Sequence, residues 1–279
     1  MRPSSLALRG IVRQQVKSLS PLILTLLANL IVIVFAMIAL WIVSTIRRDA
    51  SIVDPFWGLG FVIVAWIAWF NDSPPGLRIA ILTGLTTIWG LRLSLFLLWR
   101  NHKHGEDRRY AAMRAHHRAR FWWVSLFTVF LLQGAILWFV SLPIQCAAAL
   151  KSLVLPGWID AVGVAIWSIG MFFETVGDWQ LAQFKADPNS AGRVMDRGLW
   201  RYTRHPNYFG DFCVWWGIYL IAAAGGAWFT ILSPLLMTTL LMQVSGVRLL
   251  ESTIADRRPS YVAYMARTNA FFPGPRKAS

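Results

Sequence analysis

The sequence contains few charged residues. Asp, Glu, Lys and Arg make up 14% of its 279 residues, whereas a soluble domain carries about 25%. Hydrophobic residues account for 56% of the chain, which includes 16 Trp. Apolar runs of about twenty residues recur along it, and a helix needs about that length to cross a bilayer. Since a backbone in lipid must satisfy its own hydrogen bonds, these runs predict a polytopic membrane protein made of helices rather than barrel strands.

Signals of several other protein classes are also missing from the sequence. The two cysteines, Cys146 and Cys213, form no CxxC motif, so each is expected to be a small core residue. No GxGxxG follows a predicted strand and no GxxxxGK[ST] is present, which excludes Rossmann and P-loop binding of a nucleotide. His205 lacks a second His or Cys at ligand spacing, so no metal site is predicted. Without a recognisable motif, the net charge of +14 does not indicate a nucleic-acid partner.

Seven apolar segments predict an all-α membrane bundle of about seven transmembrane helices. They are residues 21–45, 52–70, 76–99, 121–143, 158–183, 208–224 and 227–247. The first is longer than the core of a signal peptide and is interpreted as a retained span. Residues 1–20 then form a basic N-terminal tail and residues 21–279 a single membrane domain. The second segment opens with Asp54 and Pro55, which is compatible with a helix because proline is tolerated in a first turn.

The distribution of cations predicts the topology. Lys and Arg number seven in residues 100–120, five in residues 185–204 and six from residue 248 onward, whereas the alternate loops hold one, one and none. By the positive-inside rule, the three basic segments are cytoplasmic. Seven spans then place the N-terminus outside, although the N-terminal tail is itself basic. The exposed cations are also expected to contact anionic membrane lipids of an inner or plasma membrane.

Charged and amide side chains within or beside the apolar segments are candidate site residues, because they are costly there. They are Asp54, Arg92, Glu174, Asp178, Lys185, Asn207, Asp211, Arg248 and Glu251. Spacings of three, four and seven place the members of each of the last three segments on one helix face. Such residues can simply pair and hold a bundle together. Three polar stripes beside an Arg-rich loop instead favour a ligand pocket at the cytoplasmic end.

The stretch "GLWRYTRHPNYFGD" (198–211) lies where that loop meets the sixth segment. Guanidinium groups match phosphate bidentately, so the loop's cations favour an anionic ligand. The cations are Lys185, Arg193, Arg197, Arg201 and Arg204. A helix that starts at Pro206 would present free N–H groups to a phosphate. Tyr202 and Tyr208 can stack or hydrogen-bond, His205 is a candidate acid or base, and Gly210 permits close approach.

This stretch, together with "VDPFWG", "WGLRLSLFLLWRNHKHGEDRRYAAMR", "VSGVRLLE" and "RRPSYVAYMARTNAFFP", resembles the DUF1295 family, which is grouped with the steroid 5-alpha-reductases. The resemblance covers about residues 50–275. It implies that residues 158–275 bind NADPH at the cytoplasmic side and that the substrate is a lipid-like small molecule. The cofactor positions that it implies are Asp178, Lys185, Arg193, Tyr202, Asn207 and Asp211. The spacing arguments above add Glu174, Arg204, His205, Arg248 and Glu251 to that set.

The resemblance also implies a catalytic pair. Arg92 matches an intramembrane arginine of the reductases, whereas their carbonyl-polarising Gln-Glu pair is reduced here to Asp54 in "VDPFWG". We expect Asp54 and Arg92 to meet across the bundle. Three functions are compatible with the sequence: an NADPH-dependent reductase of a lipid-like enone, an S-adenosylmethionine-dependent methyltransferase like the isoprenylcysteine methyltransferases, and a non-enzymatic scaffold or transporter. The cation count favours the first, because NADPH carries several phosphate charges and S-adenosylmethionine is itself cationic.

Overall fold

The computed structural model describes residues 5–71, 75–102, 105–152, 154–244, 251 and 260–277. These residues are mostly helical and form no strand, and one isolated bridge joins Thr203 to Asn269. Within these described ranges, six helical stretches are long and apolar enough to cross a membrane. The predicted all-α bundle and multi-pass membrane character are therefore confirmed. The chain divides into two compact units, Met1–Pro156 with Ala222–Thr230 and Gly157–Ile221 with Ile231–Ser279.

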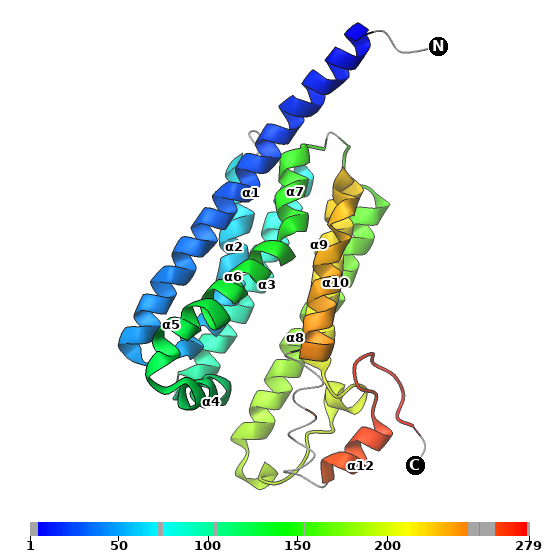
Figure 1. The fold of residues 1–279 in the computed structure, drawn as a ribbon. Helices are drawn as coiled ribbons and strands as arrows, with labels where there is room; N and C mark the ends of the chain where they lie inside the picture. Colours follow the sequence, from blue (N-terminus) through cyan, green and yellow to red (C-terminus); the bar gives the residue numbers. More distant parts are fainter. Residues whose placement is uncertain are drawn as a thin grey trace. The chain divides into compact units, whose positions relative to one another are not determined.

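The first unit contains the helices of the N-terminal half (Figure 1). They are α1 (Ser5–Arg47), α2 (Val53–Asn71), α3 (Leu77–Asn101), α4 (Arg108–His117), α5 (Phe121–Ser125), α6 (Leu132–Val140) and α7 (Leu142–Leu150). The helix α1 begins at Ser5, so it includes most of the predicted tail. Pro55 lies in the first turn of α2, as expected. Helices α2 and α3 pack so closely that a Cβ on Gly90 would lie 2.5 Å from the carbonyl oxygen of Gly58.

The predicted helix 121–143 is interrupted. A π-helical turn, Leu126–Leu131, separates α5 from α6. Ser141 is a turn residue (φ −80°, ψ −1°) that separates α6 from α7, and α7 follows where the sequence indicated a loop. The side chain of Ile144 in α7 is fully buried, and α7 packs on α1 and α2. A short helix that lacks the length to span a membrane gives too weak a periodic signal to be separated from the preceding apolar run.

The second unit contains α8 (Trp158–Ala186), α9 (Pro206–Ala222), α10 (Leu232–Thr239) and α12 (Ser260–Arg267). The apolar stretch Pro206–Gln243 is not one straight helix, because Gly226 has a φ of 104°. The indole N–H of Trp216 donates to the Thr238 hydroxyl at 3.1 Å, whereas 22 residues of straight helix would separate them by about 33 Å. Helices α9 and α10 therefore lie side by side and antiparallel (Figure 1). They correspond to the sixth and seventh predicted helices.

Glycines set the contact between α8 and α9. A Cβ on Gly170 would lie 2.6 Å from the carbonyl oxygen of Gly210, and a Cβ on Gly163 would lie 2.9 Å from that of Gly217. Gly163 and Gly170 are seven residues apart, as are Gly210 and Gly217, so each pair lies on one helix face. Small residues that let two backbones approach closely are typical of helix contacts in membranes. Gly210, expected to admit a ligand, instead admits α8.

Candidate active site

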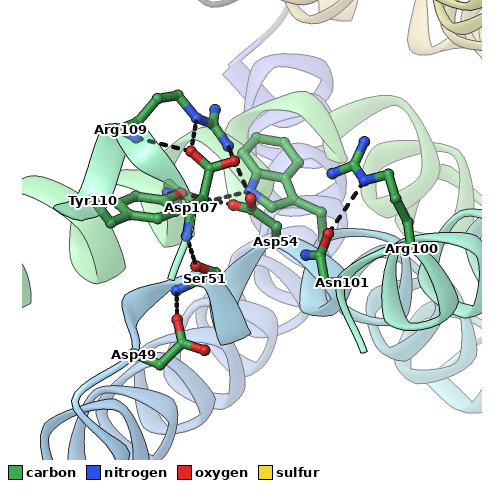
Figure 2. Close-up of polar contacts among 10 residues, drawn as sticks. Asp49, Ser51, Asp54, Arg100, Asn101, Asp107, Arg109 and Tyr110 are labelled. Atoms are coloured by element: carbon green, nitrogen blue, oxygen red, sulfur yellow. Dashed lines mark hydrogen bonds and ion pairs between the residues drawn. The ribbon is translucent and has the colours of Figure 1, made fainter. Parts of the chain in front are cut away.

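Asp54 lies at the centre of a buried polar group in the first unit. Its carboxylate accepts a hydrogen bond from the Tyr110 hydroxyl at 2.7 Å and an ion pair from the Arg109 guanidinium at 2.9 Å. The Asp54 side chain is 13% exposed, whereas that of Arg109 is 49% exposed. Figure 2 shows Arg109 reaching both Asp54 and Asp107. The carboxylate therefore sits between a cation at the surface and a phenol in the interior.

The phenol extends the group further into the first unit. Gln133 of α6 donates from its amide to the Tyr110 oxygen at 3.1 Å, and the indole N–H of Trp57 donates to the Gln133 carbonyl oxygen. Tyr110 is buried. The result is a continuous series of hydrogen bonds from Trp57 through Gln133 and Tyr110 to Asp54. A polar series of this kind within an apolar bundle can bind a carbonyl oxygen and supply a proton to it.

The segment before α4 is fastened to the start of α2. The Asp107 N–H donates to the Ser51 hydroxyl at 2.7 Å, and the Ala50 N–H donates to the Glu106 carboxylate at 2.8 Å (Figure 2 draws the first). Burial acts to raise the pKa of Glu106, but hydrogen bonds from Arg114 and Ala50 outweigh it and hold that pKa below its ordinary value. These contacts fix the position of Arg109 and Tyr110, which follow directly in α4.

The expected pair of Asp54 and Arg92 is wrong, because the ionic partner of Asp54 is Arg109. The Arg92 guanidinium instead lies 5.4 Å from the centre of the Phe96 ring, one turn along α3. Helix geometry explains the difference: α3 faces α2 through Gly90, and two residues further on the helix has turned by about 200°. Arg92 therefore lies on the opposite face of α3.

Sequence reasoning missed Tyr110, Gln133, Trp57 and Arg109. Gln133 carried a usable signal, since it is the one amide in the apolar run "FWWVSLFTVFLLQGAILWFV", and polar residues in such runs mark candidate sites. Tyr110 and Arg109 carried none, because both belong to a basic segment in which their neighbours are solvated.

In the second unit, two of the predicted polar stripes meet. The Asn207 amide of α9 donates to the Asp178 carboxylate of α8 at 3.1 Å. Glu174, one turn before Asp178, is also buried, and Asp211, one turn after Asn207, is half-buried. The predicted convergence of the α8 and α9 stripes is confirmed at Asp178 and Asn207.

Arg204 and Glu251 join the start of α9 to the C-terminal segment. The Arg204 guanidinium binds both carboxylate oxygens of Glu251, at 2.6 and 3.0 Å, and the carbonyls of Met265 and Thr268. Four of its five N–H groups are thus used within the protein. The His205 ring also contacts Glu251, at 3.1 Å. The contacts of Arg204 give it a structural role. Its predicted contact with a phosphate stays a prediction.

The Glu251 carboxylate is stabilised in its charged form by these partners. Burial acts to raise its pKa, but the hydrogen bonds from His205 and Arg204 outweigh it, so the pKa lies below its ordinary value. The ring of Tyr208 stacks on His205, with 6° between the two planes. His205 and Tyr208 are therefore held in place by their neighbours.

The remaining predicted cofactor residues are placed differently. Lys185 and Arg193 are exposed, and Tyr202 is 47% exposed. Arg248 lies outside the described residues. Over the described part of the chain, no group of three or more His, Cys, Asp or Glu side chains is arranged to hold a metal ion. Among the described residues of this unit, the predicted cofactor residues thus include the exposed Lys185 and Arg193 and the pair of Asp178 and Asn207.

Comparisons with known proteins identify the family of this chain. Residues 40–268 match the model of a protein family described as a protein of unknown function, DUF1295. The chain is 23% identical to Uncharacterized protein C594.04c of Schizosaccharomyces pombe, over 84% of this chain and 75% of that protein. No solved structure matches it. The matched region includes both the Asp54 group and the contacts of Arg204, and the chain belongs to the DUF1295 family.

Proposed function

We propose that this protein is an NADPH-dependent reductase of a carbon–carbon double bond in a lipid-like enone. The observation that carries the proposal is the buried series of Asp54, Tyr110 and Gln133, with Asp54 paired to Arg109. A phenol held between a carboxylate and an amide inside a membrane helix bundle is suited to hydrogen-bond a carbonyl oxygen of an otherwise apolar molecule. Such an apolar substrate reaches the bundle from the lipid.

NADPH, when bound, supplies a hydride to the β-carbon of the enone. The hydride leaves negative charge on the carbonyl oxygen, and one proton from solvent, added at the α-carbon, completes the saturated product. When the substrate binds, the Tyr110 hydroxyl turns its one proton from Asp54 to the carbonyl oxygen, where negative charge develops. A donor of this kind contributes about 10²–10⁴-fold to rate. The Arg109 side chain is exposed to solvent, so the ion pair with Arg109 connects Asp54 to the aqueous side. The substrate gains one hydride and one proton in total.

Among the described residues of the second unit, those that suit this cofactor are the exposed Lys185 and Arg193 and the pair of Asp178 and Asn207. Lys185 and Arg193 provide charge for phosphate groups, since such charge-assisted contacts are strong. The Asp178 carboxylate and Asn207 amide suit the hydroxyl and amide groups of the cofactor. Arg204 and Glu251 position the segment before α9.

The test uses the full-length protein in mild detergent. Loss of NADPH fluorescence is followed with a panel of enone lipids, including steroids, polyprenyl enals and fatty enals. We expect Asp54→Asn and Tyr110→Phe to bind NADPH like the parent and to lose turnover by about 10²-fold or more. Tyr264→Phe is the matched control, because its buried hydroxyl belongs to the second unit and donates to the Trp200 carbonyl. Its turnover per folded molecule should equal that of the parent.

Two results would refute the proposal. One is no NADPH consumption with any enone, and the other is full turnover in Tyr110→Phe and Asp54→Asn. Methyl transfer from labelled S-adenosylmethionine in the same preparation would establish the methyltransferase alternative instead.

A further inference from the structure

A basic hollow lies on the second unit, in the segment that joins α8 to α9. It has a volume of about 260 Å³ and is lined by Asp196, Arg197, Gly198, Arg201 and Arg276. Its three guanidiniums and one carboxylate give a net positive charge of two. The volume is below the roughly 300–1,000 Å³ of pockets that enclose a whole drug-sized ligand, so the hollow suits a charged fragment rather than a dinucleotide.

The three arginines differ in how their charges are used. Arg276 is fixed to Asp196, donating to its carboxylate at 2.9 Å and to its carbonyl at 2.8 Å. The Nε–H of Arg276 is buried and has no acceptor among the described residues. Arg197 and Arg201 are exposed, and neither side chain has a partner in the part of the chain that the structure describes. The guanidiniums of Arg197 and Arg201 are thus the two that face solvent around the hollow.

The backbone conformation of residues 198–201 shapes the hollow. Gly198 has a φ of +56°, in the left-handed region that favours glycine. A Cβ there would also strike the Gln180 side chain, whose oxygen accepts the Leu199 N–H at 3.0 Å. A short 3₁₀ turn, Gly198–Arg201, follows, and it fixes where Arg201 leaves the backbone.

We propose that this hollow binds a phosphate monoester. A monoester carries close to two negative charges at neutral pH, which matches the net charge of the hollow, and guanidiniums bind its oxygens bidentately. Two sources share this chemistry. One is the headgroup of an anionic lipid, since the hollow belongs to the segment between two candidate spans, Trp158–Ala186 and Pro206–Gln243. The other is a monoester phosphate of a soluble nucleotide. The proposal does not depend on any reductase activity.

The experiment titrates the full-length protein in detergent, by calorimetry, with two matched pairs of probes. The lipid pair is dioctanoyl phosphatidic acid and dioctanoyl phosphatidylcholine, and the soluble pair is adenosine 2′-monophosphate and adenosine. We expect only a monoester-bearing probe to bind. Arg197→Ala with Arg201→Ala should weaken that binding at least about tenfold, without lowering the melting temperature, because both side chains are exposed.

Two further variants separate a built site from general charge attraction. Arg108→Ala with Arg120→Ala removes the same charge from exposed positions of the first unit and should leave binding unchanged. Gly198→Ala keeps every charge but distorts the turn and should weaken binding, with circular dichroism used to confirm that the variant folds. Binding of phosphatidic acid alone identifies a lipid headgroup, and binding of adenosine 2′-monophosphate identifies a nucleotide phosphate. Equal binding by the parent and the Arg197/Arg201 variant, or no binding of either monoester, would overturn the proposal.

Discussion

Adding one methyl group at Gly210 should destabilise the second unit. A Cβ at this position would lie 2.5 Å from the backbone nitrogen of Glu174 and 2.6 Å from the carbonyl oxygen of Gly170. Both are backbone atoms of α8, so no side chain can rotate away and the two helices must separate. Overpacking of this kind costs about 1–3 kcal/mol. For a protein of this size class, that corresponds to a fall in melting temperature of roughly 2–12 °C.

The matched control is the same substitution at Gly84. This residue lies in the interior of α3, is exposed, and has nothing within 4 Å of an added Cβ. Alanine there restricts the unfolded chain and should stabilise the helix by about 0.5–1 kcal/mol. Gly84→Ala should therefore raise the melting temperature by a few degrees while Gly210→Ala lowers it.

Thermal unfolding of the parent and both variants in one detergent, followed by circular dichroism at 222 nm, measures the two shifts. The two shifts in melting temperature should have opposite signs. An unchanged melting temperature for Gly210→Ala would mean that α8 and α9 do not approach through their backbones, and the close contact would have to be abandoned.

Three other outcomes follow from the same contacts. In a cysteine-free background, cysteines at Ala112 and Ser190 should resist an impermeant thiol reagent in intact cells while one at Leu77 reacts; the reverse pattern would invert the topology. Because the pKa of Glu251 lies below its ordinary 4.5, its contribution to stability is complete above about pH 5 and is lost as the pH falls through 4.5 and below. Glu251→Gln should therefore melt lower than the parent at pH 7, and the gap should narrow toward pH 4; a constant gap would argue against charge stabilisation. Arg78→Ala removes hydrogen bonds to the segment after α7 and should lower the free energy of unfolding by about 1.5–3 kcal/mol. The melting temperature should fall accordingly, and a melting temperature equal to the parent's would show that these bonds contribute nothing.

The sequence predicts the contact between Asp178 and Asn207 but not the pair of Asp54 and Arg109. Asp178 and Asn207 each belong to a polar stripe on a helix face, and neighbouring helices that turn such stripes inward have few other ways to satisfy them. The contact between the two side chains could therefore be predicted from the sequence. The pairing of Asp54 with Arg109 was not, because it depends on hydrogen bonds that fasten the segment before α4 to the start of α2.

The sequence by itself determined the helical membrane architecture, the burial of Cys146 and Cys213, and the family. These follow from run length, residue type and local motif, which are properties of neighbouring residues. Tertiary structure alone decided that Arg92 faces away from α2, that Arg204 holds the C-terminal segment, and that Tyr110 joins Asp54 to Gln133. Each of those depends on helix rotation and register, which are set by close packing at glycines and by partners 23 or more residues away in the chain.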